Sequence, residues 1–436
     1  MKGAGMGGRM KEDWPEKKRM IKEILKRLHG GESVDGLKEE FKEFLETVTA
    51  REISLIEQEL IDEGMPREEM QRLCDVHLAI FKESVEGGGV SAPAGHPIGI
   101  LMNEHRAILE SAEMFRKAVL ALRDAGKEDE IEGARSELAR IKELLRDSES
   151  HYLREENVLF PYLEKHGITQ PPAIMWMEHD RIRETKKKCI ELIDVLETID
   201  RRKEEKRRSD TIHELANWTI ALSELLSNHF YKENNILFKA AMQVVTDEEW
   251  RDARIQFDEI GYCCFTPKPA AFSSAAASSA AGSAGHSREA EKGAAAPADR
   301  ERGTGEISFE TGSFEPEELE ALLDTLPFDV TFVDAEDRVK YFSNAPERIF
   351  VRTKAVIGRT VQQCHPSKSI DRVNQILEDF KSGKRDSAEF WIEMNGRLIY
   401  IRYFAVRSKR GEYLGTVEVT QDITDIKGIE GEKRLM

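Results

Sequence analysis

The sequence predicts a multidomain protein in which an all-α N-terminal domain and a four-helix bundle precede a smaller α+β domain with an antiparallel sheet. The length of 436 residues fits about three domains, at roughly 150 residues for each. Apolar residues recur with a helical period over most of the chain before residue 266, whereas they alternate with a period of two after residue 305.

Composition excludes several classes of function. The chain has 82 acidic and 65 basic residues and a net charge of −17, so the chain as a whole would be repelled by a phosphate backbone. No stretch approaches the roughly 20 apolar residues that cross a bilayer, and the N-terminus lacks the apolar centre of a secretory signal. The five cysteines are few and scattered, which is typical of a reducing compartment. We therefore expect a cytoplasmic protein with neither a nucleic-acid nor a membrane partner.

Changes in composition divide the chain into five segments. Residues 266–304 contain almost no large apolar side chain and cannot offset the entropy cost of ordering, which predicts a flexible Ala/Ser/Gly-rich linker. Residues 1–16 predict a flexible N-terminus, and the short amphipathic helices of residues 17–88 predict a small helical domain. We expect residues 95–260 and 306–434 to form the two larger domains.

Four long helical stretches follow one another within residues 95–260. They are separated near Gly126, at residues 166–172 and in the charged run 201–208. Thr246 and Glu249 predict a capping box for a final short helix. Four long helices with short connections predict an antiparallel bundle.

A duplicated motif lies inside this bundle. The sequence HYLREENVLF, which starts at His151, matches HFYKENNILF, which starts at His229. In both copies a Glu, Glu155 or Glu233, follows the His by four residues, so the two side chains lie about 40° apart around the helix and one turn apart. The apolar residues that follow continue the core face, so each His–Glu pair is expected to point inward.

A Glu-His pair precedes each copy of the motif. His105 lies 46 residues before His151, and His179 lies 50 residues before His229, which leaves room for a helix, a turn and most of the return helix. Four imidazoles and two carboxylates would then converge as a dinuclear metal site. Imidazoles suit Fe, Zn and Cu, while carboxylates prefer harder ions and can bridge two of them. Without cysteine in the set, we expect two non-haem Fe ions, with Mn or Zn as alternatives and open positions for O₂ or NO.

The alternative is that these residues have structural roles. A single inward His is more often a satisfied core or capping residue than a ligand. Six such residues in a duplicated pattern have no comparable structural explanation, because burying the carboxylates unpaired would cost on the order of several kcal/mol each.

Residues 95–245 resemble the hemerythrin-like, or HHE cation-binding, family, through both His-x-x-x-Glu motifs and both Glu-His pairs. This set is closer to the six-ligand version of iron-centre repair proteins than to the oxygen-carrying hemerythrins, which use a fifth His. Arg183 stands where that His would fall, which disfavours simple reversible oxygen storage. The resemblance implies that Glu155 and Glu233 bridge two irons and that the ligands are His105, His151, Glu155, His179, His229 and Glu233.

Five further residues are weaker candidates for a place in or around the site. His96 precedes Pro97 at a helix entrance and either caps that helix, supports a ligand or ligates directly. Glu104 and Glu178 flank expected ligands and could orient imidazoles or relay protons, or could lie on a solvated helix face. Cys74 and His77 are three residues apart on an expected helix and could touch a metal together, although packing in a core is the favoured interpretation.

Five stretches after residue 305 alternate and are rich in Val, Ile, Tyr and Phe, as strands are. Asn395 and Gly396 predict a hairpin between two of them. The expected strands are 330–334, 339–343, 388–394, 398–407 and 413–421, with helices at 315–325 and 369–382.

Residues 306–434 resemble a PAS domain, a sensor fold with a pocket for a ligand or cofactor. The resemblance rests on residues 326–334, on the turn at 357–359 and on the last strands, which end near Thr424. Cys364 and His365 lie in an expected loop and could ligate haem or a metal in that pocket, although a packed Cys in a turn is the favoured interpretation. The sequence does not indicate which ligand the pocket takes.

The N-terminal stretch is similar to the domain of unknown function that often precedes hemerythrin-like and PAS modules. The similarity rests on Gly64–Pro66 and Leu73–His77. Three successive modules are therefore expected along the chain.

The pairing of a metal bundle with a PAS-like module predicts a cytoplasmic sensor or signalling protein. Its site would detect O₂, NO or redox state, and its PAS-like domain would pass the signal to a protein partner. A homodimer through the PAS-like domain is a further expectation. No kinase, cyclase or DNA-binding sequence follows Thr424, so the signal would pass through association. The alternative is a di-iron enzyme that repairs iron centres or reduces NO or peroxide. The six-ligand pattern favours the enzyme, whereas the long linker and the PAS-like module favour the sensor.

Overall fold

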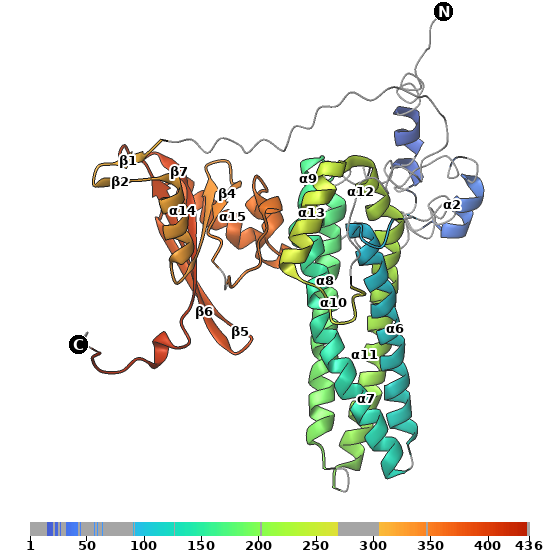
Figure 1. Ribbon diagram of the computed structural model, residues 1–436. Helices are drawn as coiled ribbons and strands as arrows, with labels where there is room; N and C mark the ends of the chain where they lie inside the picture. The colour runs from blue at the N-terminus through green and yellow to red at the C-terminus, as the bar shows by residue number, and fades with distance from the viewer. Residues whose placement is uncertain are drawn as a thin grey trace, which may run out of the picture. The chain divides into compact units, whose positions relative to one another are not determined.

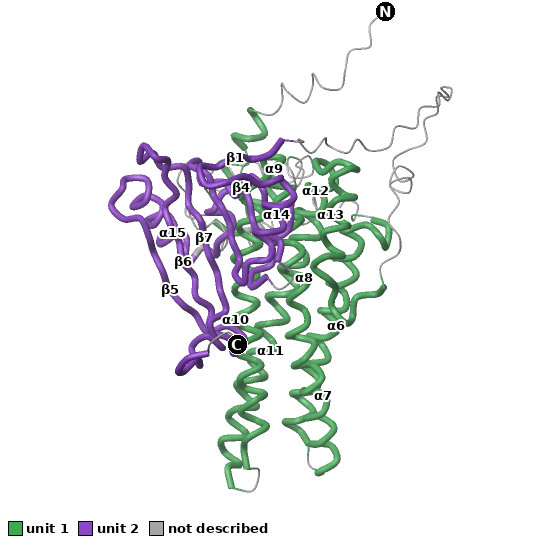
Figure 2. The backbone as a smooth tube through the Cα atoms, turned by 60° about the vertical axis from the view of Figure 1, so that its left-hand side comes forward, with its two compact units in different colours: residues 1–278 green, residues 279–436 purple. Residues whose placement is uncertain are grey.

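The computed structural model contains two compact units, Met1–Ser278 and Ser279–Met436 (Figure 2). No helix among the described residues is long and apolar enough to cross a membrane. Most of the expected linker, from residue 269 to 304, lies outside the described residues, as do Cys74 and His77. The structure describes residues 90, 92–125, 127–200, 203–268, 305–345 and 348–433, and from the N-terminal part 15–20, 22–24, 27, 32–41, 44, 56, 59 and 63.

The first unit contains the four-helix bundle that the sequence predicts (Figure 1). Helix α6 (Pro97–Asp124) packs on α7 (Glu128–Asp147) and α11 (Glu205–Lys232), and α10 (Gln170–Thr198) packs on α11 and α7. Helix α7 continues through α8 (Glu149–Arg154) to α9 (Phe160–Lys165), and α11 continues to α12 (Phe238–Val244). The N-terminal part contributes α2 (Val34–Glu40), which Ser33 caps.

The core of the bundle consists of apolar side chains at helical spacing. Phe115, Ile141, Ile182, Leu215 and Leu222 are all completely buried between the four helices. Burial of such side chains contributes on the order of 2 kcal/mol each, which is the main stabilisation of helices with this pattern.

Two of the bundle's helices widen into a π-helix at the duplicated motif. The first is η1 (Glu155–Leu159) and the second is η2 (Glu233–Leu237), so each π-helix begins at the Glu of a His-x-x-x-Glu motif. In both copies an Asn side chain donates to the carbonyl four residues earlier, Asn157 to Leu153 and Asn235 to Tyr231, each at 2.9 Å. Such single π turns are frequent at functional sites, because the extra residue re-aims the side chains around it.

A further helix, α13 (Asp247–Ile260), follows the bundle and packs on α6, α8 and η1. It begins at the predicted capping box. The Thr246 hydroxyl accepts from the Glu249 N–H, and the Glu249 carboxylate accepts from the Thr246 N–H. Residues 261–268 then return over the bundle.

The second unit is built on a five-stranded antiparallel sheet in the order β4-β3-β7-β6-β5, which confirms the predicted fold class. Positive φ values at Asn395 (53°) and Gly396 (75°) close the predicted hairpin. A two-stranded sheet that the sequence did not predict precedes it. The strands are β1 (Ile307–Phe309), β2 (Gly312–Phe314), β3 (Asp329–Asp334), β4 (Val339–Phe342), β5 (Ser387–Met394), β6 (Arg397–Arg407) and β7 (Tyr413–Asp422).

Two helices accompany the sheet, α14 (Pro316–Thr325) and α15 (Ser367–Lys381), and α15 packs on β7. Short 3₁₀ turns connect the remaining elements. They are η4 (Lys354–Val356), η5 (Val361–Cys364) and η6 (Ile426–Gly428).

Gly415 gives a stability prediction for the sheet. It has a φ of 149°, and a Cβ added there would lie 2.1 Å from the Val333 carbonyl oxygen on β3. Gly415→Ala should therefore force β7 away from β3 and destabilise this unit by more than about 2 kcal/mol. Hydrogen exchange of β3 and β7 in the full chain measures the loss.

The matched control is Gly411→Ala. Gly411 has a φ of 84° but open space around its Cα, so only the cost of the left-handed conformation, about 1 kcal/mol, is expected. Equal hydrogen exchange in Gly415→Ala and Gly411→Ala would contradict the idea that a clash with the Val333 carbonyl oxygen destabilises the Gly415 variant.

Candidate metal centre

Six side chains of the duplicated pattern converge inside the bundle. His105 comes from α6, His151 from α8, His179 from α10 and His229 from α11, while Glu155 and Glu233 are the first residues of η1 and η2. Each of the six is at most 2% exposed. The bundle therefore encloses four imidazoles and two carboxylates without access to bulk water.

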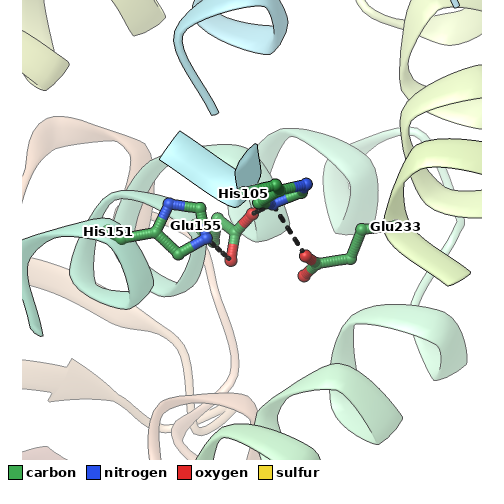
Figure 3. A group of neighbouring side chains, drawn as sticks. All are labelled: His105, His151, Glu155 and Glu233. Atoms are coloured by element: carbon green, nitrogen blue, oxygen red, sulfur yellow. Dashed lines mark ion pairs between the residues drawn. The ribbon is translucent and has the colours of Figure 1, made fainter. Parts of the chain in front are cut away.

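The six side chains form two groups that share both carboxylates. One group consists of His105, His151, Glu155 and Glu233 (Figure 3), and the other replaces the two histidines by His179 and His229. Within each group the possible ligand atoms lie within 4.8 Å of one another. Two neighbouring metal positions with two shared carboxylates follow from this arrangement.

The Nε2 atoms of the histidines face the carboxylates. His105 Nε2 lies 3.2 Å from Glu233 Oε2, and His151 Nε2 lies 3.6 Å from Glu155 Oε2. In the other group, His179 Nε2 lies 3.3 Å from Glu155 Oε2, and His229 Nε2 lies 3.0 Å from Glu233 Oε1. The Nε2 atoms of His179 and His229 are themselves only 3.0 Å apart. Two imidazole nitrogens that face each other this closely suit a shared cation.

The other ring nitrogen of each histidine is held by a polar side chain. Nδ1 of His151 lies 2.8 Å from Glu104, and Nδ1 of His229 lies 2.9 Å from Glu178. Each of these contacts fixes the ring with its Nε2 toward the centre, as is usual for metal-binding histidines. The two remaining pairs are His179 with Glu156, at 2.8 Å, and His105 with Asn234, at 3.1 Å.

A cation in turn contacts each of the carboxylates that hold a ring. Arg154 pairs with Glu104, Lys232 pairs with Glu178, and Arg183 donates to Glu156 at 2.8 and 3.0 Å. In spite of their burial, the carboxyls of Glu104, Glu156 and Glu178 have lowered pKa values, because these cations and the bound histidines favour the charged form.

The pKa values of the two shared carboxylates are shifted in opposite directions. Burial and the neighbouring Glu233 raise the pKa of Glu155 to about 8. Although burial also acts on Glu233, the facing imidazoles of His229, His105 and His179 keep its pKa well below the usual range. Without a cation, the centre therefore favours a proton on Glu155, because a second negative charge beside Glu233 is costly in a low-dielectric interior.

The polar atoms that face the centre fit a metal. Among the described residues, Nε2 of His105 and His151 and all four oxygens of Glu155 and Glu233 have no hydrogen-bond partner, although they are buried. Buried polar atoms without partners are costly unless an ion or a water satisfies them. Imidazole nitrogen and carboxylate oxygen suit Fe, Mn or Zn. The donor set and its orphaned atoms thus match a site for two such ions.

Of the weaker candidates, Glu104 and Glu178 contact the expected ligands His151 and His229, whereas His96 lies at the start of α6. His96 Nδ1 accepts from the Ile98 N–H at 3.1 Å and caps α6, and its ring packs on Trp250. This geometry favours the capping interpretation of His96, which belongs to neither ligand group.

Sequence reasoning missed most of the residues that support the ligands. Glu156, Asn234, Arg154 and Lys232 were not singled out, and Arg183 was noted only as a replaced histidine. A signal was present, since Arg154 and Lys232 each follow a motif His by three residues, and Glu156 and Asn234 each follow a motif Glu by one.

Cys364 and His365 lie beside a cavity in the second unit. His365 Nδ1 contacts the Val361 carbonyl oxygen at 2.8 Å, which occupies one ring nitrogen. Most of the cavity wall is apolar, with Arg352 and Glu418 paired at 3.5 Å. The lining residues are Thr331, Val333, Val339, Arg352, Val361, Cys364, His365, Val373, Ile376, Leu377, Tyr403, Thr416 and Glu418.

Family models match three successive parts of the chain. A family of unknown function, DUF438, matches residues 21–87, the hemerythrin HHE cation-binding domain matches residues 96–241, and a PAS domain matches residues 319–424. The chain therefore carries a DUF438 region, a hemerythrin HHE cation-binding domain with a buried His/Glu metal site, and a C-terminal PAS domain.

Similar solved structures cover about a quarter of the chain. A C-terminal domain from Streptococcus mutans is 31% identical, over 29% of this chain and 98% of that chain, with a TM-score of 0.28. A sensory box sensor histidine kinase from Vibrio cholerae is 16% identical, over 24% of this chain and 89% of that chain, with a TM-score of 0.20. A PAS domain from Colwellia psychrerythraea is 11% identical, over 25% and 97%, with a TM-score of 0.21. No curated protein matches the chain.

The shared carboxylates predict different effects for two ligand substitutions. Glu233 belongs to both ligand groups, so Glu233→Ala should weaken the binding of both metal ions by about tenfold or more. His151 belongs to one group, so His151→Ala should weaken one ion and spare the other. Metal analysis of the anaerobically purified full chain checks both.

The matched control is His213→Ala, which removes an exposed histidine from α11. It should leave the metal content unchanged. Full retention of both ions by the Glu233 and His151 variants would contradict the ligand assignment.

Proposed function

We propose that this protein is a cytoplasmic sensor in which a non-haem di-iron site in the bundle responds to O₂, NO or redox state and the PAS domain passes the response to a protein partner. The observation that carries this proposal is a set of contacts between the metal centre and the segment that leads out of the bundle. That segment, residues 261–266, is called the strap below.

The strap contacts Glu104, which holds His151, and Arg154, which pairs with Glu104. The Thr266 hydroxyl donates to Glu104, and Arg154 donates to the Gly261 carbonyl oxygen. Glu104 and Arg154 pair with each other, and Glu104 also holds His151 Nδ1. Two further contacts, Ser150 with Cys263 at 3.1 Å and the Cys264 N–H to Asp147, fix the strap to the junction of α7 and α8. The Glu104 carboxylate thus contacts both the expected ligand His151 and Thr266 of the strap.

This sharing makes the strap sensitive to the state of the centre. When bound, iron would supply redox chemistry and open coordination positions for a diatomic ligand. A change in the charge borne by the His151 ring alters how strongly Glu104 is drawn to its Nδ1. Glu104 then holds the Thr266 hydroxyl more or less strongly, and the chain runs on from Thr266 toward the PAS domain. Because the ligand set is closed to bulk water, such electrostatic changes are weakly screened.

The choice of iron rests on the donor set. Four imidazoles and two carboxylates, with no thiolate, leave Mn and Zn as alternatives, and Zn alone would not support a redox response. An enzyme that repairs iron centres or reduces NO or peroxide is the alternative function, and it would not require a contact between Glu104 and the strap.

The role of the strap is tested with Thr266→Val in the full chain. The iron-loaded wild-type protein should change the hydrogen exchange of β3, β6 and β7 when NO is added. Thr266→Val should keep its metal content and its optical response to NO but lose most of that exchange response, because it removes the direct contact between Glu104 and the strap.

Thr198→Val is the matched control, since the Thr198 hydroxyl donates only within its own helix, to Val195 at 2.8 Å. It should respond as the wild type does. If NO changed the optical spectrum of the wild-type protein but not the hydrogen exchange of its PAS domain, the sensor proposal would be contradicted. If Thr266→Val kept the full exchange response, the proposed role of the strap in passing the signal would be contradicted.

A further inference from the structure

We propose that the two halves of the metal centre hold their ions with unequal affinity and that Asn234 sets the difference. The position formed with His105 and His151 is the weaker one, and the position formed with His179 and His229 is the tighter one. This inference rests on the proposed metal site and deepens it, because it assigns a positioning role to a residue outside the ligand set.

The two halves are otherwise closely matched. His151 and His229 are each held by a Glu that precedes a ligand of another helix, Glu104 or Glu178. These carboxylates are each paired with a cation three residues after the motif His, Arg154 or Lys232. All four histidines are at most 2% exposed, so burial does not distinguish the halves.

The match fails in the support of the other histidine of each half, His179 or His105. The residue after Glu155 is Glu156, which holds His179 with a carboxylate at 2.8 Å. The residue after Glu233 is Asn234, which holds His105 with a neutral amide oxygen at 3.1 Å. Arg183, which pairs with Glu156, follows His179 by four residues, whereas Leu109 stands at that offset from His105. Charged support on one side is thus replaced by neutral support on the other.

This difference acts on the ligand strength of the histidine. A carboxylate that accepts from Nδ1 makes the opposite nitrogen a stronger donor to a metal, and the loss of such support usually costs 10- to 100-fold in affinity. Arg183 offsets part of the charge of Glu156, so the lower part of that range, about tenfold, is expected. Besides its contact with Asn234, the His105 ring stacks on Phe230 with ring centroids 4.1 Å apart, and the His179 ring stacks on Phe160 at 5.7 Å. Stacking fixes the ring but adds no negative charge.

The consequence is a centre with one exchangeable ion. At limiting metal the His179/His229 position fills first, and on chelation the His105/His151 position empties first. The ion that leaves first is also the one whose ligand His151 shares Glu104 with the strap.

Titration of the metal-free full chain with Co²⁺ under anaerobic conditions tests the inequality. Calorimetry should resolve two steps that differ about tenfold or more in affinity, and visible absorption should follow each step. Asn234→Asp should bring the two steps together by strengthening the weaker one, and Glu156→Gln should do so by weakening the tighter one. Because these two substitutions are independent, the inference stays testable if one of them impairs folding, which circular dichroism reports.

Two further variants complete the experiment. His105→Ala should remove the weak step and His179→Ala the tight one. Gln243→Glu is the matched control, since it also converts an amide into a carboxylate on an exposed site of α12, and it should leave both steps unchanged.

The outcomes separate this inference from the metal assignment. Two steps within about threefold in the wild type, or a separation that neither Asn234→Asp nor Glu156→Gln reduces, would overturn the inequality while leaving the dinuclear site in place. Failure of the wild-type chain to bind two Co²⁺ ions would overturn the dinuclear site itself.

Discussion

Mutual repulsion between two enclosed carboxylates, Glu155 and Glu233, is the constraint on which the rest of the bundle depends. Both are completely buried, each begins a π-helix, and each is shared by the two ligand groups. A low-dielectric interior tolerates such a pair only when positive charge lies between them. The four inward Nε2 atoms are donors for a cation at that place, and all six side chains of the centre are at most 2% exposed, so bulk water does not reach it.

The surrounding residues convert this local requirement into a connected network. The side chains that hold three of the imidazole rings are themselves paired with cations, of which Arg154 and Lys232 are buried. One of these pairs, Glu104 with Arg154, reaches the segment that leaves the bundle. Coupling through a contiguous set of charged contacts needs no large movement of the helices. The same network gives a role to Arg183, which stands where a histidine would be expected: it pairs with Glu156, the residue that holds His179.

The sequence was sufficient to predict the bundle, the antiparallel sheet and the convergence of the duplicated motif, because periodicity and His-x-x-x-Glu spacing are local signals. It did not reveal the π-helices at Glu155–Leu159 and Glu233–Leu237. It also left the roles of Glu156 and Asn234 unseen, because their partners are 23 and 129 residues away. His96 was ambiguous for the same reason: a capping histidine and a ligand look alike until the fold shows what Nδ1 contacts.

The central claim is that the bundle holds two neighbouring metal ions bridged by Glu155 and Glu233. X-ray absorption spectroscopy with metal analysis of the anaerobically purified full chain tests it most directly. The account predicts two iron ions per chain, only nitrogen and oxygen neighbours, and scattering from a second metal a few ångströms away. A single ion per chain, a sulfur neighbour, or the absence of metal–metal scattering in the fully loaded protein would contradict it.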